Sequence, residues 1–156
     1  MVTDDEWLDK LGTSRLFTHI DKQALTDLVA LGTQATYPEG KALVTCEQEN
    51  PYLFYVIAGT LDVLLPESEE RFSEIKLSTF KAGDCFGEYS IVDAAPASAS
   101  VVAKTEVQLF YIERSALLAF LDANPSVGKQ LYYNLLRLLV VRLRSYNHEL
   151  DLFQPY

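Results

Sequence analysis

The fold is decided by residues 83–101, which read GDCFGEYSIVDAAPASASV. Gly83 and Gly87 stand four positions apart and flank a turn, Glu88 follows the second glycine, and an alternating strand is expected to begin at Ser98. Small side chains let the backbone approach another group closely, and successive backbone N–H groups in such a turn form an anion-binding nest. The stretch therefore predicts a loop whose natural occupant is a phosphate group.

On both sides of this loop, from Tyr37 to Ile112, apolar residues recur with a period of two, and Pro or Gly interrupts the pattern at short intervals. Short strands at this spacing indicate an antiparallel barrel or sandwich. The acidic run 67–70 is expected to be a solvated hairpin tip. The clearest alternation is in Leu53, Tyr55, Ile57, Leu61, Val63, Leu65, Val107, Leu109 and Tyr111.

Helical patterns precede the strand region. Residues 4–11 predict a short helix with Thr3 as its N-cap, because acidic residues in a first turn favour the positive end of a helix. A second helix is expected to begin at Asp21 and to be closed by Gly32.

Two further helices follow the strands. Residues 115–123 form an apolar helical pattern that Asn124 and Pro125 should stop, because a residue before proline disfavours the α region. The last and longest helix is expected to start with Ser126 as its cap.

The last helix carries an apolar heptad seam over about three heptads. Its residues are Tyr132, Leu136, Leu139, Leu143, Tyr146, Leu150 and Phe153. A second stripe, made of Leu131, Leu135 and Leu138, can face the strands over the first turns. Two apolar sides on one helix need two partners, so we expect the seam to pair with a second copy of the chain. The alternative is a single broad stripe buried within the monomer.

Residues 83–101 resemble the phosphate-binding cassette of cyclic nucleotide-binding domains in catabolite-activator-like regulators, kinase regulatory subunits and gated channels. The resemblance rests on Phe86-Gly87-Glu88, on Pro96-x-Ser98-Ala99, and on the order of the surrounding elements. It covers nearly the whole chain. It implies a single mainly-β domain over 1–156, a double-stranded β-helix or β-roll of eight strands. N-terminal helices would occupy 1–35, the roll 36–112, and the C-terminal helices with a long dimerisation helix 113–156.

The resemblance also implies the site. In the family the Glu, here Glu88, accepts from the ribose 2′-hydroxyl, and an Arg between the Pro and the Ser clamps the cyclic phosphate. The same geometry would let Glu88 hold its own loop by accepting backbone N–H groups, and would let Ser98 be a small strand residue instead of a phosphate donor. The candidate ligand-binding residues are Gly87, Glu88, Tyr89, Ala97, Ser98 and Arg142.

Ala97 stands where the family has the clamping Arg. A buried phosphate must be paired or multiply hydrogen-bonded, and a guanidinium supplies two parallel charge-assisted bonds. No basic residue lies between Gly83 and Ala103. A substitute must come from elsewhere in the fold, and the candidates are Lys41, Lys104, Arg114 or an Arg of the last helix.

Arg142 is the one polar residue in 138–143, the part of the last helix that faces the base in family members. It is expected either to stack on a base or reach a phosphate, or to pair with surface carboxylates.

Composition narrows the functions further. Thirteen Lys and Arg against twenty-two Asp and Glu give a net charge of −9, which repels nucleic acid. The N-terminus lacks a secretory signal pattern and no apolar run is long enough to span a membrane, so we expect a cytoplasmic protein.

The two cysteines, Cys46 and Cys85, suggest reduced thiols, and the two histidines, His19 and His148, suggest surface residues. We expect neither a metal site, nor a cofactor, nor a catalytic residue, and therefore no enzyme.

These observations favour a stand-alone regulatory module that binds cAMP or cGMP weakly, or an altered ligand, and acts on an unidentified downstream protein. The alternative is a ligand-free dimeric interaction scaffold. A further alternative is a fragment of a catabolite-activator-like transcription regulator. Such regulators continue past the long helix into a helix-turn-helix domain, whereas this sequence ends at Tyr156, so direct DNA binding is not expected of this chain.

Overall fold

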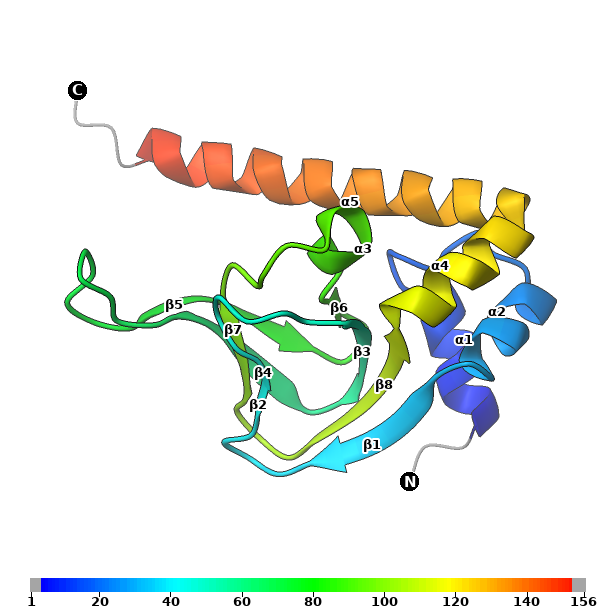
Figure 1. The fold of residues 1–156 in the computed structure, drawn as a ribbon, viewed down its shortest axis with the longest axis horizontal. Coiled ribbons are helices and arrows are strands. Elements are labelled where there is room, and N and C mark those ends of the chain that lie inside the picture. The colour runs from blue at the N-terminus through cyan, green and yellow to red at the C-terminus, as the bar shows by residue number, and fades with distance from the viewer. Residues whose placement is uncertain (1–3, 153–156) are drawn as a thin grey trace.

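The computed structural model describes residues 4–152, in which two four-stranded antiparallel sheets face each other and helices cover one side (Figure 1). The strands are β1 (Thr33–Tyr37), β2 (Ala42–Val44), β3 (Tyr52–Ala58), β4 (Thr60–Leu65), β5 (Ile75–Lys81), β6 (Cys85–Phe86), β7 (Ser100–Ala103) and β8 (Val107–Glu113). The helices are α1 (Asp4–Thr13), α2 (Lys22–Val29), α3 (Tyr89–Asp93), α4 (Arg114–Ala123) and α5 (Pro125–Leu152). The sheet orders are β1-β8-β3-β6 and β2-β7-β4-β5. The predicted eight-stranded β-roll with flanking helices is confirmed.

β3 is buried on both faces, because the roll has a core on each side of the first sheet. Phe54 and Val56 point between the two sheets, where they join Leu61 and Leu109. The alternate positions, exemplified by Tyr55, pack against the helices in a second core. The alternation predicted for this strand therefore separates two apolar environments and not core from solvent.

Some strand boundaries differ from the prediction. β1 begins at Thr33 and not at 36, and β7 begins at Ser100 and not at Ser98. The second difference arises because the backbone of Ala97 pairs with the β2–β3 connection, where it donates to Gln48 O at 2.9 Å and accepts from Glu47 N at 2.8 Å. Residues 94–99 therefore form a loop fixed by backbone hydrogen bonds, not the start of a strand. The acidic run 67–70 is exposed at the β4–β5 hairpin tip, as predicted.

The N-terminal helices follow the predicted pattern, with one correction. The Asp21 side chain accepts from Ala24 N at 2.9 Å and caps α2, as expected. However, α2 ends at Val29, and Gly32 does not close it. A side chain at Gly32 would overlap the Phe110 ring, so this glycine is required for close packing. The predicted cap Thr3 lies outside the described residues.

The C-terminal helices also need one correction. α4 ends at Ala123 before Asn124, as predicted, but α5 begins at Pro125, so Ser126 lies inside the helix and is not its cap. Proline suits the first helical position because the N–H that it lacks would be unpaired there in any case. Phe153 lies outside the described residues, and Leu150 belongs to α5 with a side chain that the structure does not describe.

α5 lies across the roll (Figure 1). One of its apolar faces is buried and another is exposed. Leu131, Leu135 and Leu138 are buried, and Asn134 Nδ2 donates to Leu16 O at 3.0 Å and Thr18 O at 2.7 Å. Four seam residues are 40–62% exposed, namely Tyr132, Leu136, Leu143 and Tyr146, whereas Leu139 is half-buried. For the described part of α5, a single stripe buried within one chain is wrong.

The remaining sequence predictions concern isolated residues. Cys46 and Cys85 are both free thiols, the first half-buried and the second buried. His19 and His148 are exposed. Over residues 4–152, none of the helices has both the length and the apolar character needed to cross a bilayer.

Candidate functional site

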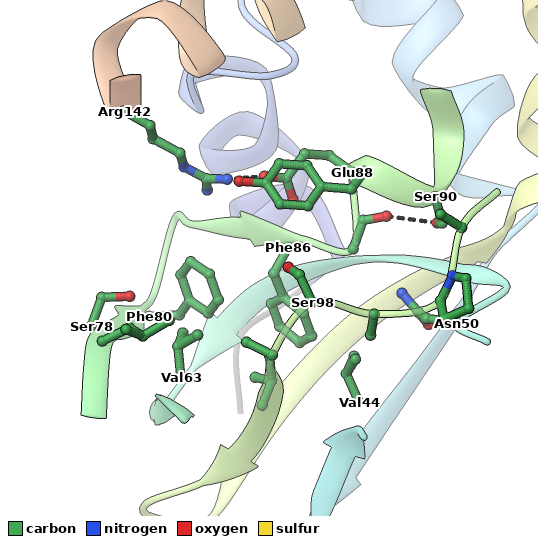
Figure 2. Close-up of a pocket in the computed structure, with 18 of the residues that line it drawn as sticks. Val44, Asn50, Val63, Ser78, Phe80, Phe86, Glu88, Ser90, Ser98 and Arg142 are labelled. Carbon is green, nitrogen blue, oxygen red and sulfur yellow. Dashed lines mark hydrogen bonds and ion pairs between the residues drawn. The ribbon is translucent and has the colours of Figure 1, made fainter. Parts of the chain in front are cut away.

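A cavity of about 160 Å³ lies between the loop 94–99, the second sheet and α5 (Figure 2). All six candidate ligand-binding residues line it, namely Gly87, Glu88, Tyr89, Ala97, Ser98 and Arg142. The cassette and the last helix therefore meet at one place, although about forty positions separate Ser98 from Arg142 in the chain.

The turn at Gly87 gives the cavity its shape. Gly87 has φ +84°, which favours glycine, and a side chain there would overlap the Tyr52 carbonyl and the Asn50 amide. Asn50 Nδ2 in turn donates to Tyr52 O at 2.8 Å. Gly83 has φ +96°, so both glycines that flank the predicted turn adopt a left-handed backbone conformation.

The short helix α3 was not predicted and forms the rim of the cavity. Ser90 Oγ donates to Gly87 O at 2.7 Å, and Ala94 adopts a left-handed conformation with φ +54° that ends the helix. Arg114 Nε donates to Ser90 O. This bond uses Arg114 to brace the rim, so Arg114 is not the missing phosphate clamp.

Glu88 and Arg142 form an ion pair at the top of the cavity, as Figure 2 shows. Only 3% of Glu88 is exposed. Nη2 of Arg142 also lies 3.5 Å from Cys85 O, and the guanidinium carbon is 5.9 Å from the centre of the Phe80 ring. Burial lowers the pKa of the Arg142 guanidinium below its ordinary value. The predicted pairing of Arg142 with surface carboxylates is wrong, because its partner is the buried carboxylate of Glu88 in the cassette.

Few cationic side chains line the cavity beside Ala97, among the residues that the structure describes. Neither Lys41, Lys104 nor Arg114 lines the cavity. Arg142 is therefore the one cation among the lining residues that the structure describes, and it is already paired.

The walls of the cavity are mostly apolar, and sequence reasoning did not assign them to the site. The Phe80 and Phe86 rings stack with centres 5.3 Å apart, and Phe86 also stacks on Phe54 at 4.6 Å. The strand alternation could have shown that these side chains face inward, but not which of them surround a ligand. The apolar wall residues are Val44, Val63, Leu77, Phe80, Phe86 and Val101.

Two tyrosines lie at the rim. Tyr89 belongs to α3, and Tyr146 belongs to the α5 seam but also lines the cavity. Burial, and secondarily the neighbouring Tyr146 hydroxyl, raise the pKa of Tyr89. The part of α5 expected to contact a second subunit is therefore continuous with the cavity.

A wider hollow of about 700 Å³ also borders Arg142, and Lys10, Arg15 and Asp84 line it. Arg142, Phe80 and Tyr146 line both spaces. Arg142 therefore borders both spaces, as Leu77 and Ser78 also do. Among the described side chains, which end at residue 148, His, Cys, Asp and Glu do not gather into a group of three that could hold a metal ion.

Comparison with known proteins shows which family shares this sequence and fold. The cyclic nucleotide-binding domain family matches residues 34–124, more than half of the chain. The CRP-like cAMP-activated global transcriptional regulator of Mycobacterium tuberculosis is 28% identical over 148 residues, which cover 94% of this chain and 61% of the relative. The cyclic AMP receptor protein of Thermus thermophilus is 34% identical over 116 residues, covering 74% of this chain and 51% of the relative.

A solved structure shares the fold closely. The crystal structure of a cyclic nucleotide-binding domain from Methylobacillus flagellatus superposes with a TM-score of 0.82 at 25% identity, covering 96% of this chain and 83% of that one. This chain spans 61% and 51% of the length of the two curated relatives above. The family match, the fold and the cassette residues that line the cavity all agree. The chain therefore belongs to the cyclic nucleotide-binding domain family.

Proposed function

We propose that the chain is a regulatory module that binds a small molecule at the cassette, taking cAMP or cGMP only weakly or taking an altered ligand. The observation that carries this proposal is the meeting of all six candidate residues around one cavity, with the buried Glu88 carboxylate at its top. Ala97 supports weak cyclic nucleotide binding, because the phosphate has no guanidinium beside Ser98.

The output of the module is a change in α5. Arg142 belongs to α5 and pairs with Glu88 of the cassette, so a ligand that contacts Glu88 also acts on the last helix. A ligand shifts a conformational equilibrium only through its different affinity for two states. The Glu88–Arg142 contact is the place where such a difference would arise.

Two copies pair through the exposed side of α5. Large apolar side chains on one helix face, with Tyr89 and Val92 of α3 also exposed, form a surface that soluble monomers rarely leave uncovered. Two copies of the same helix can cover it by a two-fold pairing. The pairing residues are Tyr132, Leu136, Leu139, Leu143, Tyr146, Leu150 and Phe153.

We place the module in the cytoplasm and assign it no enzymatic activity. Its net charge of −9 argues against direct DNA binding by these residues. The Mycobacterium tuberculosis relative, which is named as a transcriptional regulator, is longer than this chain, so the further alternative is that the chain is a fragment of a catabolite-activator-like transcription regulator.

A ligand-free scaffold is the second candidate, and one observation favours it. Arg142 already satisfies Glu88, so the cassette is electrostatically complete without a ligand. In that case the function of the roll is to hold α5 exposed for contact with another chain.

Hydrogen exchange with and without ligand separates these two functions. We expect millimolar cAMP or cGMP to protect amides in residues 83–101 and in α5, with the hairpin tip 67–70 as an internal control that stays unchanged. Binding isotherms by calorimetry should show saturation. If a broad set of nucleotides and uncharged ring compounds protects neither segment, the scaffold reading replaces the regulatory one.

A further inference from the structure

We propose that the preferred ligand of the cavity is an uncharged aromatic molecule that carries a hydroxyl or amino group, not a phosphate ester. This inference rests on the proposed ligand-binding function and specifies which class of molecule the same cavity takes.

The first argument is charge. Among the described residues that line the cavity, Glu88 and Arg142 are the two charged side chains, and they neutralise each other. An anion buried there would lack a cation of its own, and burying an unpaired charge is strongly unfavourable. The net charge of −9 on the whole chain further disfavours the approach of an anion. An uncharged ligand meets neither obstacle.

The second argument concerns whether Arg142 can be released to serve a phosphate. Its guanidinium is engaged in three directions, toward Glu88, toward Cys85 O and over the Phe80 ring. Removing it would leave Glu88, 3% exposed, as a buried carboxylate without a counter-charge. A phosphate would have to outcompete Glu88 for the same guanidinium, whereas an uncharged ligand leaves the pair intact.

The third argument is shape. The cavity volume of about 160 Å³ is close to the engineered apolar cavity of roughly 150 Å³ that binds benzene. Stacked phenylalanine rings, Phe80 and Phe86, form one wall, and Val44, Val63 and Val101 complete the apolar surface. A planar ring packs well against such a wall.

The polar groups at the cavity suit the remaining part of the ligand. A carboxylate offers more acceptor positions than the one that Arg142 occupies, so Glu88 can also accept from a ligand hydroxyl or amine. Ser98 presents a hydroxyl at the same cavity and can donate or accept (Figure 2). Uncharged hydrogen-bonding groups on one edge of a ring would match both residues.

Two matched pairs of compounds test the proposal by calorimetry and saturation-transfer NMR on the full 156-residue chain. Adenosine is compared with cAMP, and 4-hydroxybenzyl alcohol with 4-hydroxybenzoate, so that within each pair the main difference is the anionic group. We expect the uncharged member to bind about tenfold more tightly or better in each pair, the equivalent of about 1.4 kcal/mol. Added salt should leave its affinity nearly unchanged.

Two variants supply the controls. Ala97→Arg puts a cation into the cavity and should invert the preference toward the anionic members. Thr36→Arg adds the same charge at an exposed site on β1, away from the cavity, and should leave the preference unchanged.

The outcomes distinguish this inference from the proposed function. If the anionic members bind the wild type as tightly as the uncharged ones or more tightly, the inference is overturned while the ligand-binding function stands. If none of the four compounds binds the wild type or Ala97→Arg, both the inference and the ligand-binding function fail.

Discussion

Arg142 of α5 forms an ion pair with Glu88 of the cassette, across 54 positions of sequence and at the top of the cavity. This contact connects the element that would hold a ligand with the element that would join two subunits. It also explains how a buried carboxylate is tolerated in an apolar cavity, because a buried charge is stable only when it is paired.

The first prediction concerns this ion pair. Arg142→Gln should lower the free energy of unfolding by about 3 kcal/mol, because it leaves Glu88 buried without a counter-charge. Adding Glu88→Gln should recover most of the loss, since neither charge then remains. Urea unfolding of the single and double variants measures both effects.

Arg144→Gln is the matched control, because Arg144 is exposed on the same helix. Its effect should stay within about 0.5 kcal/mol. Equal stability of the two Arg→Gln variants would show that the Glu88–Arg142 pair contributes nothing to the fold.

The second prediction concerns Gly87. Gly87→Ala should destabilise the protein by more than Gly40→Ala, although the two glycines have nearly equal φ angles of +84° and +83°. A Cβ at Gly40 meets nothing within 4 Å, whereas one at Gly87 overlaps the Tyr52 carbonyl and the Asn50 amide. Gly40→Ala should therefore cost about 1 kcal/mol from the backbone alone, and Gly87→Ala should cost more. Thermal and urea unfolding give the comparison, and equal losses would show that the loop can move away from Tyr52.

The sequence was informative for several local features, although the cap expected at Ser126 and the helix end expected at Gly32 were wrong. The turn flanked by Gly83 and Gly87, the Asp21 cap and the buried stripe beginning at Leu131 all follow from spacing and residue type. The pairing of Arg142 with Glu88 could not be predicted, because spacing along the chain contains no information about which helix side chain reaches a distant loop.

Short elements could not be predicted from the sequence either. α3 has five residues, too few to show a helical period, and its end at Ala94 is set by a left-handed conformation that an alanine rarely adopts. The β7 boundary moved for a similar reason, because backbone pairing of Ala97 with the β2–β3 connection leaves no pattern in the side chains.

The third prediction concerns assembly. We expect the wild type to sediment as a dimer at micromolar concentration, because the α5 seam otherwise exposes several large apolar residues. Leu136→Glu with Leu143→Glu should give monomers that still fold, since both side chains are exposed within one chain. Leu139→Glu with Leu143→Glu should give monomers or insoluble protein, because Leu139 also packs against the buried core.

Arg137→Glu is the control for charge. It changes the net charge by two units, as the double Leu→Glu substitutions do, and its exposed side chain lies on α5 but outside the seam. It should remain dimeric. A wild type that sediments as a monomer would contradict the assignment of the seam.

The fourth prediction concerns alkaline pH. Burial raises the pKa of Tyr55 from 10.0 to about 12. An acid whose pKa is higher in the folded state ionises first in the unfolded state, so its contribution to stability is full below pH 10 and is lost as the pH rises toward 12. In urea unfolding, Tyr55→Phe should therefore lose less stability than the wild type between about pH 10 and 11.5. Tyr133→Phe, at an exposed position of α5, should follow the wild type, and parallel curves for all three proteins would show that Tyr55 does not cause the slope.

The last prediction concerns Ala97. Its backbone is held by Glu47 and Gln48, and its side chain lines the cavity beside Ser98, so an arginine at this position can reach the cavity without changing the loop. Each hydrogen bond to a charged group contributes about 1.5–3 kcal/mol, so Ala97→Arg should tighten cAMP or cGMP binding about tenfold to a hundredfold or more. Glu88→Ala in that background should weaken binding again, because a ribose hydroxyl would lose its acceptor.

Calorimetry on the wild type, Ala97→Arg and the double variant measures each step. If Ala97→Arg folds normally and still does not bind millimolar cAMP or cGMP, the missing guanidinium is not what limits the cavity, and if uncharged ring compounds also fail to bind, the scaffold function becomes the better account of the chain.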